Sequence, residues 1–485
     1  MQLNRPDLLR QQCYVAGKWC DADDGSTAPV TNPATGAIIA TVPMMGVAET
    51  RRAIEAARDA QKAWAARTAK DRGGVLRKWF ELMMTHQEDL ARILTAEMGK
   101  SLTEARGEIA YGASFIEWFA EEGKRVYGET VPQHATDKRI LVLKQPIGVT
   151  AAITPWNFPN AMITRKVGPA LAAGCAQIIK PALETPLSAL ALAVLAEEAG
   201  LPGGLMSILT GKSREIGGEL TSSPIVTKLS FTGSTEVGRI LMEQCAPTIK
   251  KLALELGGNA PFIVFDDADV DSAVEGAIIS KFRNSGQTCV CANRLFVQEG
   301  IYDTFAEKLA ARVAQLKIGN GMDEGVNQGP LINMAAIAKV EEHVADVLAG
   351  GGKAIAGGKR HELGGSFFYP TVLTGVTADM KIFKEETFGP VAPLIKFKDE
   401  AEVIELSNRT EFGLASYFYS RDIGRIFRVA EALEYGMVGV NTGLISTAEA
   451  PFGGVKQSGL GREGSRHGIE DYLEIKYVCL GDINK

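Results

Sequence analysis

The sequence has little of what marks several common classes of protein. Its 485 residues include only 5 histidines and 7 cysteines, and no group of them has the spacing of a zinc site. The odd, scattered set of cysteines also argues against a disulfide framework. No block of basic residues is present, and the formal charge is −6. A metal, a nucleic acid and a membrane surface are therefore not expected partners.

Targeting and membrane signals are also scarce. Residues 1–10 lack the apolar core of a secretory signal. The uncharged stretch 145–164 has the length of a membrane span, but it contains three prolines and Asn157. We therefore expect a cytoplasmic protein.

The composition that is present is that of a large globular protein. Hydrophobic residues make up 46% and charged residues 23% of the chain, and 52 glycines indicate many tight turns. At roughly 150 residues per domain, the length predicts about three domains.

Hydrophobic periodicity predicts helices first and then an α/β unit. Residues 50–64 and 70–94 carry apolar residues at helical spacing. From residue 147, short apolar runs alternate with helical patterns, which predicts right-handed crossovers and a parallel sheet that binds ligands at the carboxyl ends of its strands. The predicted strands are 149–153, 176–179, 205–209, 228–231 and 252–254, and the helices between them are 161–173, 186–199, 215–220 and 234–245.

A second α/β unit begins at residues 261–265. Its further strands are predicted at 295–298, 392–397, 415–419 and 437–440, and its helices at 301–316 and 335–348. Residues 130–144 predict an extended pair of strands with a turn near 135–138.

Three segments resemble well-known sequence motifs but lack residues or flanking elements that those motifs require. Gly459–Gly464 fits G-x-G-x-x-G, but no apolar strand precedes it and about 20 residues follow, too few for a βαβ unit. Residues 210–213 resemble the end of a phosphate-binding loop without its first glycine. Residues 267–278 begin like a calcium loop but lack its central glycine and final glutamate. None of the three predicts a site.

Three other residues have surroundings that suit chemistry. A cysteine is most often a small buried hydrophobe, but Cys289 lies among glycine and polar residues beyond a predicted helix, which favours an exposed, reactive thiol. Glu255 follows an apolar strand, where a carboxylate is either structurally paired or raised in pKa as a base. Asn157 ends the first parallel strand, where its amide serves either an oxyanion or a turn.

Two further segments suit a nucleotide. Lys180 places a cation at the end of the second predicted strand, where a ribose or phosphate could lie. Residues 231–238 run from strand through a glycine turn into a helix, whose N-terminus can hold a pyrophosphate through free N–H groups and the helix dipole.

Five short segments, taken together, resemble the NAD(P)-dependent aldehyde dehydrogenase superfamily over essentially the whole chain. They are 155–159, 254–259, 286–289, 386–390 and 451–456. Residues 162–166, the Cys-Val-Cys triplet at 289–291 and residues 459–465 are similar to the succinate-semialdehyde dehydrogenase branch, which explains the misleading glycine match.

The resemblance implies an α/β fold with a Rossmann-type parallel-sheet cofactor domain, an α/β catalytic domain and a small β oligomerisation element. The implied boundaries are 1–125 and 147–256 for the first, 257–460 for the second, and 126–146 and 461–485 for the third. It also implies a homo-oligomer, most often a tetramer.

The resemblance assigns roles to particular residues. Cys289 would be the nucleophile, Glu255 the general base, and Asn157 with the Cys289 backbone N–H the oxyanion hole. Arg165, Arg283 and Ser446 match positions that hold the substrate carboxylate, although either arginine would also suit a structural ion pair. The cofactor would lie along Trp156, Asn157, Lys180, Pro181, Ala182, Leu183, Gly233, Ser234, Leu256, Glu386 and Phe388.

Coenzyme choice and redox behaviour are two further expectations. NAD-preferring relatives often carry Glu at position 183, and this chain has Leu183, which would not repel a 2′-phosphate. NADP is therefore the expected cofactor, with NAD possible. Cys291 is either a buried hydrophobe or a resolving thiol for Cys289. In an extended segment these two side chains would point to opposite faces, so a disulfide would require the loop to rearrange.

The implied reaction is oxidation of succinate semialdehyde, or a closely related carboxylate-bearing semialdehyde, to the dicarboxylate, with a role in 4-aminobutyrate degradation. Glutarate semialdehyde or a broad range of aldehydes are alternative substrates. A non-redox cysteine hydrolase or acyltransferase would also use the three catalytic residues, but it would leave the parallel unit without a ligand. A structural or binding subunit would not need Cys289 and Glu255 intact.

Overall fold

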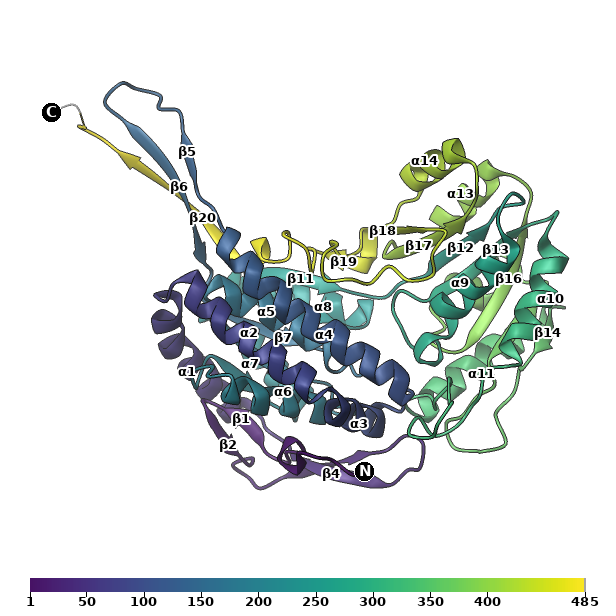
Figure 1. Ribbon diagram of the computed structural model, residues 1–485, viewed down its shortest axis with the longest axis horizontal. Helices are drawn as coiled ribbons and strands as arrows, with labels where there is room; N and C mark the ends of the chain where they lie inside the picture. The colour runs from purple at the N-terminus through teal and green to yellow at the C-terminus, as the bar shows by residue number, and fades with distance from the viewer. Residues whose placement is uncertain (484–485) are drawn as a thin grey trace.

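An eight-stranded sheet forms the core of the larger lobe in the computed structural model, which describes residues 1–483 (Figure 1). The strand order is β19-β11-β10-β7-β8-β9-β1-β2. The five central strands are parallel: β7 (Val149–Ile153), β8 (Ala176–Lys180), β9 (Met206–Ile208), β10 (Val226–Thr232) and β11 (Lys251–Glu255). Antiparallel strands complete the edges: β1 (Cys13–Val15), β2 (Lys18–Cys20) and β19 (Gly459–Leu460).

Helices cover this sheet and explain why its strands are apolar throughout. All five residues of β8 are buried, as expected where a parallel sheet is covered on both faces. The crossover helices are α5 (Ala161–Ala173), α6 (Leu187–Glu198), α7 (Ser213–Ser222) and α8 (Thr235–Cys245). Four N-terminal helices pack around them: α1 (Val47–Ala65), α2 (Ala69–Thr85), α3 (Gln87–Met98) and α4 (Leu102–Glu122).

The prediction of a single helix over 70–94 is wrong. His86 ends α2 and precedes α3 with φ −105° and ψ 20°, outside the helical range. Its ring Nε2 lies 3.2 Å from Nη1 of Arg5, on a segment far away in the sequence. The apolar spacing continues through the break, so periodicity alone does not locate it.

The smaller lobe contains a seven-stranded sheet of order β14-β15-β16-β13-β12-β17-β18, parallel except for β14. Its strands are β12 (Ala260–Val264), β13 (Ala292–Gln298), β14 (Lys353–Ala356), β15 (Thr371–Thr374), β16 (Val391–Phe397), β17 (Ala415–Tyr419) and β18 (Met437–Val440). Its helices are α9 (Val270–Phe282), α10 (Tyr302–Val313), α11 (Met334–Ala349), α12 (Lys381–Lys384), α13 (Glu400–Asn408) and α14 (Ile423–Ala432).

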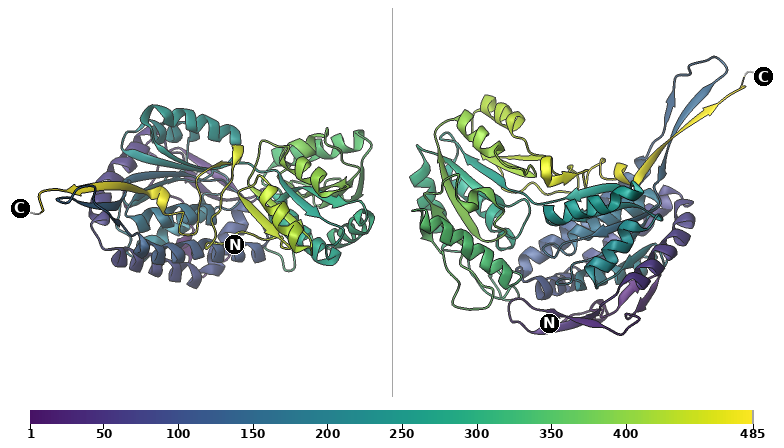
Figure 2. Two further views of the ribbon diagram at one scale, coloured as in Figure 1. Left: turned by 90° about the horizontal axis from the view of Figure 1, so that it is seen from above. Right: turned by 180° about the vertical axis from the view of Figure 1, so that it is seen from behind.

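A three-stranded antiparallel sheet projects from the larger lobe as an arm, and its last strand runs toward the tip (Figure 2). It consists of β5 (Glu129–Val131), β6 (Arg139–Pro146) and β20 (Leu473–Leu480). The pairing of β20 with β6 runs from Leu473 opposite Pro146 to Leu480 opposite Arg139. The predicted strand pair in 130–144 is present, and the C-terminal segment is its third member.

The α/β fold class predicted from the sequence is confirmed. Every predicted strand and crossover helix of the two α/β units is present, with ends displaced by up to three residues. The pattern did not reveal the short N-terminal strands, among them the hairpin of β3 (Thr27–Thr31) and β4 (Ile38–Pro43). Within residues 1–483, no helix is long and apolar enough to cross a membrane.

Candidate active site

The three expected catalytic residues line one cavity of about 190 Å³. The carboxyl ends of β10 and β11 form one wall of it, as predicted for a parallel sheet. The loop between α9 and β13 supplies another wall. The lining residues are Pro155, Asn157, Met162, Thr232, Gly233, Ser234, Glu255, Leu256, Gly257, Cys289, Glu386 and Phe388.

The backbone that carries Cys289 is set by unusual dihedral angles just after α9. Asn284 and Ser285 have φ of 53° and 54°, and Gly286 has φ of 75°. A Cβ on Gly286 would lie 2.1 Å from the carbonyl oxygen of Gly389, so only glycine fits there. The chain then turns at residues 288–291, where the Cys291 N–H donates to the Thr288 carbonyl at 2.9 Å. This geometry holds the Cys289 thiol in the cavity.

Cys289 is half-buried rather than exposed, which corrects the sequence-based expectation. Burial raises the pKa of its thiol to about 12, and the positive charge of Arg165 opposes that rise. The thiol is therefore protonated at neutral pH. A nearby base or charge is needed to make it nucleophilic.

Asn157 is held from both its backbone and its side chain. Its carbonyl oxygen accepts from Lys100 Nζ at 2.8 Å and from Asn284 Nδ2 at 3.1 Å. Its Nδ2 donates to the Gln287 carbonyl at 3.0 Å, which places the amide beside the Cys289 loop. Lys100 is in turn paired with Glu108 at 2.6 Å, and both side chains are buried. The carboxamide is thus fixed where an oxyanion donor is needed.

Sequence reasoning missed Lys100 and Glu108. Glu108 accepts from the backbone N–H groups of Asn160 and Ala161 at 3.0 and 3.2 Å, which ties α4 to the start of α5. These residues lie 49 to 57 positions before Asn157 in the chain. No local pattern could have connected them with it.

Glu255 is the last residue of β11 and is 3% exposed. Neither of its carboxylate oxygens has a hydrogen-bond partner among residues 1–483. Burial, together with the nearby charge of Glu463, raises its pKa to about 8. Of the two alternatives left open by the sequence, structural pairing is absent, and a carboxylate tuned as a base matches the geometry.

The cavity also fits a dinucleotide. At Gly233, between β10 and α8, a Cβ would lie 2.4 Å from the Phe231 ring, and at Gly257 one would lie 3.1 Å from Glu386 Oε2. Neither position has room for a side chain unless its neighbours move. Helix α8 begins at this point with Ser234 as its cap, and its first N–H groups have no intrahelical acceptors.

Glu386 and Phe388 shape the other side of the cavity. Glu386 accepts from the Gly258 N–H at 3.3 Å, and burial raises the pKa of its carboxyl to about 8. Phe388 packs edge-on against Trp156 with ring centroids 5.6 Å apart. A carboxyl with spare oxygens beside aromatic rings suits ribose hydroxyls.

The structure divides the expected cofactor residues into two groups. Asn157, Gly233, Ser234, Leu256, Glu386 and Phe388 line the cavity, whereas Trp156, Lys180, Pro181, Ala182 and Leu183 do not. The second group follows β7 and β8, which are neighbours in the same sheet. Lys180 donates to the Pro181 carbonyl at 3.2 Å, and burial lowers its pKa. Leu183 packs against the hydrophobic core of the larger lobe.

The expected substrate residues differ in how they are engaged. Arg283 and Ser446 line the same small cavity, together with Thr288. The Arg283 guanidinium lies 5.3 Å from the Phe158 ring centroid and forms no salt bridge or hydrogen bond with residues 1–483. Arg165, by contrast, is buried in an ion pair with Glu463. Of the two arginines, Arg165 therefore forms the structural ion pair that was the alternative to binding the substrate carboxylate.

Cys291 is buried, and its Sγ lies 3.7 Å from the Lys281 carbonyl oxygen. The expectation that Cys289 and Cys291 belong to an extended segment is wrong, because residues 288–291 form a hydrogen-bonded turn. The objection that their side chains must point to opposite faces therefore does not apply.

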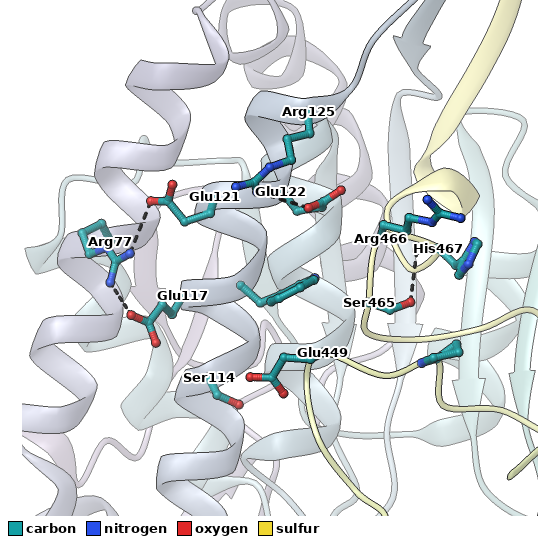
Figure 3. Close-up of a pocket in the computed structure, with 12 residues that line it drawn as sticks. Arg77, Ser114, Glu117, Glu121, Glu122, Arg125, Glu449, Ser465, Arg466 and His467 are labelled. Atoms are coloured by element: carbon teal, nitrogen blue, oxygen red, sulfur yellow. Dashed lines mark hydrogen bonds and ion pairs between the residues drawn. The ribbon is translucent and has the colours of Figure 1, made fainter.

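A second, larger cavity of about 730 Å³ lies between α4 and the C-terminal segment (Figure 3). None of the expected site residues lines it. Its cations are largely engaged already: Arg77 pairs with Glu117 and Glu121, and Arg125 pairs with Glu122. No group of side chains in residues 1–483 is arranged to hold a metal ion. The three expected catalytic residues line the smaller cavity, which contains Cys289.

Comparison with known proteins identifies the family of this chain. The family model described as "Aldehyde dehydrogenase family" matches residues 19–478. A glutarate-semialdehyde dehydrogenase of Pseudomonas aeruginosa is 68% identical over 483 residues, covering 100% of both chains. A succinate-semialdehyde dehydrogenase [NADP(+)] of Escherichia coli is 66% identical over 481 residues, covering 99% of this chain and 100% of its own.

A solved structure agrees equally well. The crystal structure of an E. coli NADP-dependent enzyme superposes with a TM-score of 0.98 at 65% identity, covering 99% of this chain and 100% of that one. The family model, the relatives and the fold all extend over nearly the whole length. This chain belongs to the aldehyde dehydrogenase family.

Proposed function

We propose that the protein oxidises succinate semialdehyde, or a closely related carboxylate-bearing semialdehyde, to the dicarboxylate with reduction of NAD(P)⁺. The observation that carries this proposal is a pair of arginines: Arg283 contacts the Phe158 ring but forms no salt bridge or hydrogen bond within residues 1–483, and Arg165 is buried where its charge acts on Cys289. Planar guanidinium groups suit recognition of a carboxylate. Glutarate semialdehyde is the second candidate, because a relative of that name is 68% identical.

In the proposed reaction, Cys289 is the nucleophile. The thiol loses its proton to solvent, which the positive charge of Arg165 favours. The thiolate adds to the aldehyde carbon and gives a thiohemiacetal, whose oxyanion accepts hydrogen bonds from Asn157 Nδ2 and the Cys289 backbone N–H. A donor of this kind is worth roughly 3 kcal/mol. Because the Asn157 backbone is fixed by Lys100 and Asn284, its amide needs little reorganisation during the reaction.

Residues on the opposite wall would hold the dinucleotide: Gly233 and Ser234 at the start of α8, and Glu386 and Phe388 at the ribose. When bound, the nicotinamide supplies the hydride acceptor. Glu255 would then remove a proton from the water that hydrolyses the thioester, for which its unpaired and buried carboxylate is suited. A non-redox cysteine hydrolase would use the same residues but would produce no absorbance change at 340 nm.

Arginine substitutions test the substrate proposal. Arg283→Ala and Arg165→Ala should each raise KM for succinate semialdehyde by about 10-fold or more, because a bidentate charged contact is lost. KM for butanal, an uncharged aldehyde of the same length, should change by less than about twofold. Steady-state kinetics with both aldehydes measures the ratio. Equal losses on the two substrates would mean that the arginines do not contact the carboxylate.

The proposed preference for NADP⁺ depends on position 183. Leu183 offers no charge to repel a 2′-phosphate, and Lys180 lies nearby in the chain as a cation. The neighbouring Glu184 is exposed, and its charge acts on Lys180. Leu183→Glu should therefore shift kcat/KM toward NAD⁺ by about 10-fold, whereas Glu184→Gln should shift it toward NADP⁺. A wild-type enzyme that clearly prefers NAD⁺ would show that position 183 does not decide the choice.

Cys291 is the candidate resolving thiol for Cys289. After peroxide oxidises Cys289 to a sulfenic acid, attack by the Cys291 thiol would form the disulfide and release water. Peroxide should then inactivate the wild type reversibly, with activity restored by dithiothreitol. Cys291→Ala should be inactivated without full recovery. Complete recovery of that variant would leave Cys291 with a packing role only.

A homotetramer is the assembly we propose, with the arm as part of its interface. Tyr127, just before β5, and Ile475 and Tyr477 in β20 are 70%, 72% and 60% exposed, an unusual concentration of apolar surface. Light scattering on the purified protein measures the mass directly. The domain boundaries given above and a cytoplasmic location remain proposals. All seven cysteines are unpaired, as a reducing compartment requires.

A further inference from the structure

The segment that carries Glu386 and Phe388 runs between α12 and β16, and its side chains point in two directions. Glu386 and Phe388 line the catalytic cavity. Glu385 and Thr387 instead contact His343 on α11. Glu385 has φ −109° and ψ 147°, and alternation of this kind is typical of extended backbone. One face of the segment therefore belongs to the cavity and the other to α11.

His343 is buried against the two residues that it contacts. Its side chain is 0% exposed, with Nδ1 3.1 Å from Thr387 Oγ1 and Nε2 3.3 Å from Glu385 Oε2. Burial lowers the pKa of the imidazole, so the ring is neutral at physiological pH. The hydrogen bond from Lys339 lowers the pKa of the Glu385 carboxyl, which is therefore ionised and can only accept. The ring proton is thus on Nε2, and Nδ1 accepts from the Thr387 hydroxyl.

The two contacts of His343 differ in how much depends on them. Glu385 also forms an ion pair with Lys339, so its side chain has a second partner. Within residues 1–483, the Thr387 hydroxyl has no hydrogen-bond partner other than His343. The backbone is held separately by Asn293, whose Oδ1 accepts from the Thr387 N–H at 3.2 Å and whose Nδ2 donates to the Glu385 carbonyl at 2.9 Å. The orientation of the Thr387 side chain thus depends on His343.

Phe388, the next residue, has a backbone conformation that requires support. Its φ is 51°, in the left-handed region, which a residue with a bulky side chain adopts only where neighbouring groups hold it. Gly389 follows, packed so closely on α11 that a Cβ there would lie 2.3 Å from Val340 Cγ2. Steric contact therefore prevents the segment from moving toward α11, and the hydrogen bond between Thr387 and His343 opposes movement away from it.

We propose that His343 is a positioning residue for the nicotinamide cofactor, because its hydrogen bond with the Thr387 hydroxyl keeps Glu386 and Phe388 at the cavity wall. This inference rests on the proposed function, in which those two residues hold the ribose of the dinucleotide. His343 does not itself line the cavity and acts only through the segment that it anchors. Loss of this anchor weakens cofactor binding and leaves aldehyde binding unchanged.

His343→Ala should raise the dissociation constant of NADPH about 5- to 20-fold, because a buried hydrogen bond is lost and the segment is free to move. Fluorescence titration with NADPH measures this constant without turnover. KM for succinate semialdehyde at saturating NADP⁺ should stay within about twofold of the wild-type value. His361→Ala is a matched control and should bind NADPH like the wild type. The His361 ring packs against Tyr369, and none of its hydrogen bonds within residues 1–483 reaches the segment 385–389.

Two polar replacements separate the hydrogen bond from the volume of the ring. In His343→Asn the side-chain oxygen lies near the former Nδ1 and can still accept from Thr387, whereas in His343→Gln the amide reaches the former Nε2 and Glu385. We expect His343→Asn to bind NADPH within about twofold of the wild type, and His343→Gln to bind as weakly as His343→Ala. If the ring only filled space, the larger glutamine would be the better replacement. That order, or equal losses in the two variants, would overturn the inference.

Thr387→Val tests the other end of the same hydrogen bond. Valine keeps the shape of threonine but has no hydroxyl, so the dissociation constant of NADPH should rise by about the same factor as in His343→Ala. Combining the two changes should weaken binding by less than about twofold beyond either alone, because they remove one interaction. Full additivity would show that the two residues act independently and would refute the anchor. If His343→Ala does not fold, Thr387→Val and His343→Asn decide the matter.

Glu386→Ala and Phe388→Ala separate this inference from the proposed function. If neither variant changes the dissociation constant of NADPH, the segment does not hold the cofactor, and the proposed cofactor site fails. If either weakens binding by about fivefold or more while His343→Ala and Thr387→Val do not, the anchor is overturned and the proposed function stands.

Discussion

Cys289→Ser should reduce turnover by roughly 10⁴-fold or more while leaving the fold intact. A serine hydroxyl is much harder to ionise than a thiol, and this site already disfavours the ionised form. Burial raises the pKa of the Cys289 thiol to about 12, so a still weaker acid would supply almost no nucleophile. Serine differs from cysteine only by an oxygen in place of the sulfur, so the packing around residue 289 should be preserved.

The measurement is the rate of absorbance increase at 340 nm with succinate semialdehyde and NADP⁺, together with a thermal melt. Cys20→Ser is a matched control, because Cys20 is also half-buried but lies in β2, far along the sheet from the cavity. It should keep wild-type turnover. Activity of Cys289→Ser within about tenfold of wild type would exclude the covalent mechanism.

The placement of the three proposed catalytic residues could be predicted because each follows a local pattern. Asn157 comes just after β7, Glu255 ends β11, and Cys289 follows α9 through a glycine-containing loop. In a parallel sheet the carboxyl ends of strands share one edge, so the first two residues had to converge. The alternation of short strands with helices along the chain also predicts that the central strands run parallel.

The contacts that tune these residues could not be predicted. Lys100 reaches Asn157 from the connection between α3 and α4, and the Glu463 contact with Arg165 joins residues 298 positions apart. Such contacts depend on how helices pack, which no short-range pattern encodes. The segment 459–465 did give a signal, since it contributed to the family resemblance, but nothing in it identified Glu463 as the ion-pair partner of Arg165.

Burial was the other property that the sequence did not reveal. The polar neighbours of Cys289 favoured an exposed thiol, yet those neighbours point into the protein: Asn284 and Gln287 satisfy backbone groups around the loop. A polar sequence can therefore surround a buried site when its side chains are used to hold the backbone.

Glu255→Gln should slow steady-state turnover by about 10²–10⁴-fold while sparing the first chemical step. The amide has nearly the same shape as the carboxyl but cannot accept a proton from water. Thioester hydrolysis should therefore become rate-limiting. Rapid mixing with excess aldehyde and NADP⁺ should show a burst of absorbance at 340 nm close to one equivalent per subunit, followed by a very slow phase.

The pH dependence gives an independent check of the same role. Burial raises the pKa of Glu255 to about 8, and a base must be unprotonated, so the active form is lost as the pH falls below that value. At pH 6 only about 1% of the carboxyl is ionised, and wild-type kcat should fall about tenfold per pH unit below 8. In Glu255→Gln the residual rate should lack this acid limb. A variant that retained the wild-type slope would show that another group is the base, and loss of the burst would place Glu255 in the activation of Cys289 instead.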